Sequence, residues 1–486
     1  MILEADIMRK KILYLFITIS ILFVCVFTQI GFSDFHNRYI QHEKAVPPDP
    51  VTAGSEEEFY THLPLISIDT HGKEIAGNKR EDTSKTACTI QIWDQDGVYH
   101  KFDEIPAVMT NAEINIRGNS SRLFDKKGYK IHLYDENWIK KDISFDGMAE
   151  NDEWILNGPF LDKTLLRNYL CYNLAGQVMD YAPNVRYCEV FINGEYEGIY
   201  LFIEPIERAK TKVNITGINP FLNTTGYILQ LDTVYHTRTG DLNNYTHYSY
   251  ELPTSRSFVI TYPGKTKLTP ELTDYIEKDI SKIEKALYSY DYDDPFYGYR
   301  AKMDVNNFID YFIINEFSMN SDSFRKSTYL YKSSGGKLKT CVWDFNNAFD
   351  NYIDIDESGD GFSLPKHPYY VMLLRDKKFV DLLINRYREL RKTILSEAYI
   401  NQFIDDTVEY LGPAIDRNYE RWGYSYDVSK VDGNNKLFPD ERNPKNYEEA
   451  VVMLKNTIHA RIEWMDNHID TLYQYCADSA NINYDN

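Results

Sequence analysis

Apolar and polar residues alternate along the first half of the chain, whereas apolar residues in the second half recur at every third or fourth position. Alternation over short runs predicts half-buried strands, here at 63–68, 87–93, 112–116, 128–134, 185–192, 200–204, 227–231 and 257–262. The longer period predicts amphipathic helices, at 272–287, 376–395, 397–410, 413–422 and 447–473. We therefore expect an α+β fold with two lobes, a strand-rich N-terminal lobe at 59–266 and a helix-rich C-terminal lobe at 267–476.

Two local signals add detail to the strand-rich lobe. Asn193-Gly194, between two predicted strands, is a strong hairpin signal, and we expect the turn to extend through 195–198. Asp162 precedes an apolar-periodic stretch, which predicts a helix over 163–176 with Asp162 as its cap. Arg167 lies beside the apolar stripe of this helix, so it is expected either to snorkel at the edge of the core or to clamp neighbouring segments.

The stretch 315–350 carries the clearest candidate chemistry. An apolar-periodic helix ends near Phe317, a polar turn containing Asp322 follows, and two strand-like runs at 327–332 and 338–343 flank Gly335-Gly336. The second run leads directly into Asp344. Because a hairpin brings its two ends together, we expect the two carboxylates to approach each other, although they are far apart in sequence. They suit a cation site or an acid/base pair; the alternative is that they are ordinary turn and strand-end residues.

An arginine-headed loop follows the strand at 112–116. Its residues, Arg117, Gly118, Asn119, Ser120 and Ser121, supply backbone N–H groups and hydroxyls that suit an anion, although an ordinary turn has a similar composition. On the next strand, Lys130 is positioned to reach toward this loop, the alternative being a solvated surface lysine. A cleft with these cations on one side and two aspartates on the other has the polarity that a metal-bound polyphosphate needs.

Composition excludes some classes of partner. The 486 residues carry a formal net charge of −20, which argues against nucleic acid or an anionic membrane surface as a partner, and no basic patch offsets it. Five cysteines follow the first apolar segment at wide spacing and without a CxxC pair, so the sequence predicts neither a zinc site nor a disulfide framework.

The beginning of the chain resembles a membrane-targeting segment. Arg9-Lys10-Lys11 precede an uncharged apolar run at 12–32 that is about long enough to span a bilayer. We expect residues 1–33 to be a signal anchor or a cleaved signal peptide, 34–58 a stalk linker, and 477–486 a tail. The expected location is the cell membrane, with a single pass and an extracytoplasmic domain, or the exterior if the signal is cleaved.

Several motifs taken together resemble the CotH kinase family, which is named for spore coat protein H and is an atypical branch of protein-kinase-like enzymes. The resemblance covers about 63–468. It is carried by Ile114–Ser121, Tyr129–Leu133, Leu166–Asn168, Val190–Tyr200 with Glu204, Asp322, Ser327–Lys332, Gly336–Leu338, Trp343–Asn346 and Arg461–Asp466.

The resemblance implies a two-lobed atypical protein-kinase-like fold that binds ATP with Mg²⁺ or Mn²⁺. It implies transfer of the γ-phosphate to Ser or Thr of an exported or surface protein whose identity the sequence does not name. Asp322 would be the catalytic acid that orients or deprotonates the acceptor hydroxyl, and Asp344 and Asn346 would bind the metal. The loop 117–121 and Lys130 would contact the phosphates, and Glu204 would lie at the hinge to the adenine.

Two positions depart from the commoner family pattern. Arg325-Lys326-Ser327 stands where many members have an asparagine soon after the catalytic aspartate, and Asn346 stands where many have aspartate. This combination resembles the exported bacterial type. Two other functions stay open at this point: a non-catalytic surface-anchored binding or adhesion protein on a kinase-like scaffold, and a glycoside hydrolase that pairs Asp322 with Asp344. The hydrolase hypothesis leaves the Arg117 loop and Lys130 without a role.

Overall fold

Seven strands of the N-terminal half close into a barrel. The computed structural model describes residues 36–46, 59–79, 82–233, 241–248, 256–353 and 359–478. Neighbouring strands around the barrel are β1 (Leu65–Asp69), β2 (Thr86–Trp93), β3 (Val108–Arg117), β4 (Gly128–Tyr134), β7 (Glu153–Asn157), β9 (Glu195–Ile203) and β8 (Val185–Ile192). β1 and β8 pair in parallel and close the barrel, whereas the other neighbours are antiparallel.

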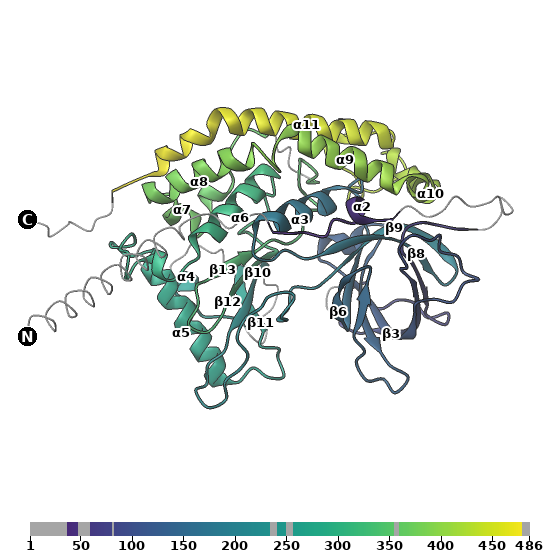
Figure 1. The fold of residues 1–486 in the computed structure, drawn as a ribbon, viewed down its shortest axis with the longest axis horizontal. Helices are drawn as coiled ribbons and strands as arrows, with labels where there is room; N and C mark the ends of the chain where they lie inside the picture. Colours follow the sequence, from purple (N-terminus) through teal and green to yellow (C-terminus); the bar gives the residue numbers. More distant parts are fainter. Residues whose placement is uncertain are drawn as a thin grey trace, which may run out of the picture. The chain divides into compact units, whose positions relative to one another are not determined.

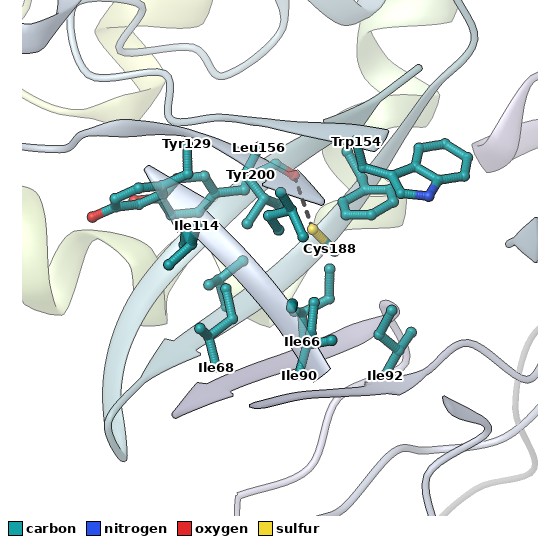
Figure 2. Close-up of a cluster of buried hydrophobic side chains, with 14 of the residues drawn as sticks. Ile66, Ile68, Ile90, Ile92, Ile114, Tyr129, Trp154, Leu156, Cys188 and Tyr200 are labelled. Carbon is teal, nitrogen blue, oxygen red and sulfur yellow. Dashed lines mark hydrogen bonds between the residues drawn. The ribbon is translucent and has the colours of Figure 1, made fainter. Parts of the chain in front are cut away.

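The barrel interior is filled by every second residue of these strands. Figure 2 shows isoleucines of β1 and β2 facing the aromatic side chains Tyr129, Trp154 and Tyr200 of β4, β7 and β9. A hairpin of β5 (Ile143–Phe145) and β6 (Met148–Asn151) adds Phe145 to the same core. Each fully buried side chain of this size contributes about 1.5–3 kcal/mol, so the alternating pattern of the sequence is also the main source of the barrel's stability.

A second sheet has four strands in the order β11 (Arg256–Tyr262), β10 (Tyr227–Thr233), β12 (Thr328–Lys332) and β13 (Lys339–Cys341). All its neighbouring strands are antiparallel. β10 and β11 precede the boundary expected at 266/267 and β12 and β13 follow it, so the sheet crosses that boundary. Periodicity reports local structure and carries no information on which distant strands pair. The two-lobed arrangement therefore stays a prediction.

Helices form the rest of the C-terminal half. They are α5 (Pro270–Leu287), α6 (Val305–Phe317), α7 (Tyr370–Leu373), α8 (Lys377–Leu390), α9 (Glu397–Leu411), α10 (Pro413–Trp422) and α11 (Tyr447–His468), with α3 (Arg167–Val178) and the short α2 (Gln41–Lys44) and α4 (Tyr245–Tyr248) from the N-terminal half. α6 is buried along its length and contacts α3, α8 and α11 (Figure 1). Side-chain caps at Thr269, Asp304, Asp376, Ser396 and Asn446 set where the long helices begin.

The predicted elements are largely confirmed, with several corrections. Two predicted helices are too long at their C-terminal ends, because α8 ends at Leu390 rather than 395 and α11 ends at His468 rather than 473. The hairpin turn is only Asn193-Gly194, both at positive φ (53° and 82°), because such a turn matches the twist of its strands; 195–198 belong to β9. The helix expected from 163 begins at Arg167, and the short strands β5, β6 and β7 were not predicted. α10 and β4 have the predicted bounds.

Part of the expected linker 34–58 is folded. Arg38 donates to the carbonyls of Ala182 (2.8 Å) and Pro183 (2.5 Å), and Gln41 accepts from the Tyr187 backbone N–H (2.7 Å). Both residues are polar, so their burial depends on distant partners that local composition does not reveal. The remaining linker residues 47–58, the predicted anchor 1–33 and the tail after residue 478 lie outside the described residues. Among the helices that are described, none has the length and apolarity to cross a bilayer.

Candidate functional site

A cavity of about 310 Å³ lies where one end of the barrel meets the second sheet and the turns that flank β12 and β13. It gathers most of the predicted site residues. Its lining includes the whole loop 117–121, Asp322, Asp344 and Asn346, and it also includes Lys326, Asn347, Asn157, Asn168, Tyr172, Gln230 and Asp232. The hairpin argument for the two carboxylates is confirmed in this respect, because both line the same cavity.

Asp322 is held by a tight turn after α6. Its backbone carbonyl accepts the N–H groups of Arg325 (3.0 Å) and Lys326 (2.9 Å). Its carboxylate is 3 % exposed, and Oδ2 accepts the Asn347 side-chain amide at 2.9 Å while Oδ1 lies 3.3 Å from Lys326 Nζ. Phe324 has a positive φ of 53°, a conformation that non-glycine residues keep only where the surroundings enforce it. The carboxylate is therefore fixed, with a cation directly beside it.

Asp344 is held by the first turns of α3. Its backbone N–H donates to the Tyr172 hydroxyl at 3.0 Å, and the next N–H, of Phe345, donates to Asn168 Oδ1 at 2.8 Å. Asn168 Nδ2 in turn donates to Asn346 Oδ1 (2.6 Å), and Asn346 Nδ2 donates to Asp344 Oδ1 (2.7 Å). Asp344 also has a positive φ of 62°. The turn that carries the predicted metal ligands is thus positioned residue by residue from one helix.

The carboxylates of Asp322 and Asp344 lie close enough to repel each other. Burial raises the pKa of Asp344 above its ordinary value, and the neighbouring Asp322 raises it further, against opposing effects of Arg117 and Lys326. Burial alone would lower the pKa of Lys326, yet the charge of Asp322 keeps it above its ordinary value. Adjacent carboxylates that repel each other in this way attract a cation placed between them.

Of the two roles expected for Arg167, snorkelling at the core edge or clamping neighbouring segments, the structure shows the clamp. Arg167 is 8 % exposed, and Nη1 pairs with Asp162 at 2.6 Å while Nε donates to the Ala348 carbonyl at 2.8 Å and Nη2 to the Phe349 carbonyl at 3.3 Å. Asp162 also accepts the Arg167 backbone N–H at 2.8 Å, but the N-cap position of α3 is Leu166 and not the predicted Asp162, because the helix begins four residues later than expected. Together Arg167 and Asp162 tie the chain after Asp344 to the start of the helix.

The loop 117–121 follows β3 of the barrel and contacts the chain that follows β13. Gly118 has a φ of 106°, and a Cβ at this position would overlap Ser121 Oγ, so the loop requires glycine here. Arg122 donates to the carbonyls of Gly118 and Gly77 and thereby ties the loop to the segment around Gly77. The Arg117 guanidinium lies over the Trp343 ring, 5.5 Å from its centroid. The donor loop and the residue before Asp344 are therefore in direct contact.

Two predicted site residues are not gathered with the others. Lys130 points from the outer face of β4 to Glu153, with its Nζ 2.5 Å from Oε1, and does not line the cavity. Glu204 is fully buried at the end of β9, where it accepts the backbone and side-chain amides of Asn184 at 2.9 and 3.0 Å. Their phosphate-binding and hinge roles stay predictions.

Several other residues that line the cavity were not predicted from the sequence. Asn347 follows the predicted ligand Asn346 directly, and Lys326 is four positions from Asp322, so both had a signal in their sequence neighbourhood. Gln230 and Asp232 come from β10 and had none.

The cavity offers oxygen donors that are compatible with a divalent cation. Across the ranges that the structure describes, no three His, Cys, Asp or Glu side chains are grouped so as to enclose a metal. The cavity instead offers two carboxylates and an asparagine. Mg²⁺ characteristically takes one or two carboxylates and completes its octahedron with water and substrate phosphates. Asp344, Asp322 and Asn346 therefore offer oxygen atoms of the kind that a divalent cation takes, and Asn346 Oδ1 also accepts the Asn168 amide.

Comparison with known proteins agrees with the resemblance of the motifs. The model of the family described as CotH kinase protein matches residues 114–465, which include the donor loop, both aspartates and most of α11. The chain is also 24 % identical over 377 residues to inner spore coat protein H of Bacillus subtilis (strain 168), across 74 % of this chain and 87 % of that protein.

Proposed function

Because the chain belongs to the CotH kinase protein family, we propose that it is an atypical protein kinase that transfers the γ-phosphate of ATP to a serine or threonine hydroxyl. The observation that carries the proposal is the single cavity in which the loop 117–121 joins Asp322 and Asp344. A glycosidase needs only the carboxylate pair, whereas a polyphosphate ligand also uses the donor loop.

In this proposal the triphosphate would lie against the donor loop 117–121. The cavity volume is within the range of small-ligand sites. Backbone N–H groups and hydroxyls of Gly118, Asn119, Ser120 and Ser121 would donate to phosphate oxygens, and the Arg117 guanidinium would add charge. Because Arg122 and the Trp343 contact hold this loop in place, the donors need little rearrangement when the nucleotide binds.

Asp344 and Asn346 would hold Mg²⁺ or Mn²⁺. When bound, the ion neutralises charge on the β- and γ-phosphate oxygens. The chain's own part is to fix the two ligands, which Tyr172 and Asn168 do through the hydrogen bonds to the 344–346 turn.

Asp322 would act on the acceptor. Its carboxylate would accept a hydrogen bond from the serine or threonine hydroxyl and receive the proton as the oxygen attacks the γ-phosphorus, while the bond from the γ-phosphorus to the β,γ-bridging oxygen breaks and ADP leaves. Asn347 holds Oδ2, which fixes the orientation of the carboxylate. Lys326, 3.3 Å from Oδ1, would stabilise the negative charge on the transferred phosphoryl group. Lys326 thus takes a role at the position where the family pattern more often has asparagine.

The acceptor is proposed to be an exported or surface protein. Its approach is supported by a smaller cavity of about 250 Å³ on the other side of the Asp322 turn, lined by Asn320, Ser321, Arg325 and Lys366 among others. The extracytoplasmic location, as a single-pass membrane protein or a secreted one, rests on the basic residues 9–11 and the apolar run 12–32.

Titration of the full-length protein with ATP, with and without Mg²⁺ or Mn²⁺, tests the proposal. We expect metal-dependent binding that is lost in Asp344→Asn, retained in Asp322→Asn, and unchanged in Asp274→Asn, an exposed residue of α5 that pairs with Lys278. Phosphate transfer to a serine-containing acceptor should be lost in both cavity variants. Absence of binding at millimolar ATP would reject the kinase and favour the non-catalytic binding protein.

A further inference from the structure

A second, larger cavity lies at the other end of the barrel strands. β3 runs from Val108 to Arg117, roughly 30 Å for a strand of this length; Arg117 lines the site described above, and the β2–β3 connection next to Val108 lines the second cavity. Its volume is about 500 Å³, and it is lined by Gln41, His42, Ala45, Val46, His62, Pro64, Asp94, Gln95, Asp96, His100, Asp146, Asp406, Glu409 and Tyr410.

Separate parts of the chain build this cavity. The folded segment around α2 contributes one wall, the β2–β3 connection and the β5–β6 turn contribute the barrel side, and α9 contributes the opposite side. A ligand here would contact the N-terminal segment, the barrel and a C-terminal helix at once.

The lining is strongly anionic. It contains five carboxylates, of Asp94, Asp96, Asp146, Asp406 and Glu409, and neither lysine nor arginine. Asp94 accepts the Asp146 backbone N–H and Asp96 accepts the Val46 N–H, each at 2.9 Å, so their charges are held at the cavity wall. Within the described ranges, Asp146 is the one carboxylate of the five with an ion pair, with Arg186 Nε 3.2 Å away. Such a concentration of negative charge favours a positively charged occupant.

Three histidines stand among these carboxylates without neutralising them. Burial lowers the pKa of His42 and of His100 to about 4, so both are uncharged at neutral pH. His62 Nε2 lies 2.5 Å from the Tyr410 carbonyl, which makes it a donor there.

Buried imidazole groups in the cavity lack partners. His100 is only 2 % exposed, its ring makes no hydrogen bond to the described residues, and its ring nitrogens are not fully shielded, so they are accessible from the cavity that His100 lines. The Nε2 of His42 is buried without a partner in the part of the chain that the structure covers, while its Nδ1 meets the Tyr169 hydroxyl at 3.0 Å. A buried polar group without a hydrogen bond is costly. These imidazoles therefore point to a ligand that supplies hydrogen bonds.

We propose that this cavity binds a small organic cation that bears ammonium or guanidinium groups. The cationic N–H groups would donate to the carboxylates of Asp94, Asp406 and Glu409 and to the free imidazole nitrogens. The carboxylates come from three separate elements, the β2–β3 connection, the β5–β6 turn and α9, a spread that suits an organic cation. A cavity of this volume lies within the range of small-molecule sites.

The test is calorimetric titration of the full-length protein, without nucleotide, with 1,4-diaminobutane and agmatine, and with 1,4-butanediol as the uncharged analogue. Leaving out nucleotide makes the result independent of the proposed kinase activity. We expect saturable binding of the two cations and none of the diol. The double variant Asp406→Asn with Glu409→Gln should weaken binding at least about tenfold, and His100→Gln should also weaken it.

Asp405→Asn is the matched control. It removes one charge from the same helix, but Asp405 is exposed and pairs with Lys455 at 2.5 Å outside the cavity, so binding should change less than twofold. Asp406 and Glu409 lie at the surface of α9, so their variants should keep the thermal transition of the parent. Absence of saturable cation binding, equal binding of the diol, or equal weakening by Asp405→Asn would each overturn the proposal.

Discussion

Replacing Arg167 by lysine should show how strongly α3 holds the turn that carries Asp344. Lysine keeps the positive charge, and its single ammonium group can still pair with Asp162. It cannot also reach the carbonyls of Ala348 and Phe349, which Arg167 contacts through Nε and Nη2. Two buried hydrogen bonds from a charged donor are therefore lost. At about 1.5 kcal/mol each, the lower end for such bonds, the free energy of unfolding should fall by about 3 kcal/mol.

Urea unfolding followed by tryptophan fluorescence measures this loss, and the affinity for Mg²⁺–ATP in the same variant should fall about tenfold as the 344–350 turn loosens. Arg388→Lys is the matched control, because Arg388 pairs with Asp470 on the surface and should cost less than about 1 kcal/mol. If Arg167→Lys were as stable as Arg388→Lys, the clamp would have no energetic role and the argument for a positioned turn would fail.

Three further predictions use the same cavities. Gly118→Ala should weaken ATP binding, because the φ of 106° at this position strains the backbone of any residue with a Cβ; equal binding by Gly118→Ala and the parent would contradict the strained loop. Lys326→Met should reduce the rate of phosphate transfer at least about 100-fold with ATP affinity nearly unchanged, and Lys326→Arg should recover part of the rate; a loss confined to ATP affinity would place Lys326 in nucleotide binding instead. Burial holds the pKa of His42 and His100 at about 4 in the folded chain, below the value near 6.5 of the unfolded chain. The unfolded chain therefore binds up to two more protons between pH 6.5 and 4, and the free energy of unfolding should fall by up to about 2.7 kcal/mol for each pH unit by which the pH is lowered in that window, about 1.36 kcal/mol from each imidazole. Urea midpoints at pH 7, 5.5 and 4.5 measure the fall, and His100→Gln should flatten it.

The sequence predicts well what depends on neighbouring residues. The hairpin between Asp322 and Asp344 follows from two alternating runs around Gly335-Gly336, and α10 follows from its period and the proline that opens it. The β5–β6 hairpin also had a local signal, since Asp146-Gly147 has positive φ at both residues (41° and 72°) and is a favoured turn pair. It was missed because its strands are too short to show alternation.

What could not be predicted depends on partners far along the chain. Asn168 and Asn346 are 178 positions apart and meet only because α3 packs beside the 344–346 turn. The side chain of Lys130 has the right type and strand for a phosphate contact, yet the ion pair with Glu153 on the adjacent strand orients it elsewhere. Spacing in sequence identifies which residues are available, whereas strand pairing decides which of them share a cavity.

The parallel pairing of β1 with β8 also has a consequence for biosynthesis. Leu65 lies opposite Glu189, so β1 has to wait for 124 further residues before its partner emerges. At roughly 5–20 residues per second this wait lasts about 6–25 s. During that time the apolar side chains of Ile66 and Ile68 and one strand edge lack their final cover. An unpaired apolar edge is a template for association with other nascent chains, so the yield of this protein should depend on what shields β1 while the rest of the barrel is being made.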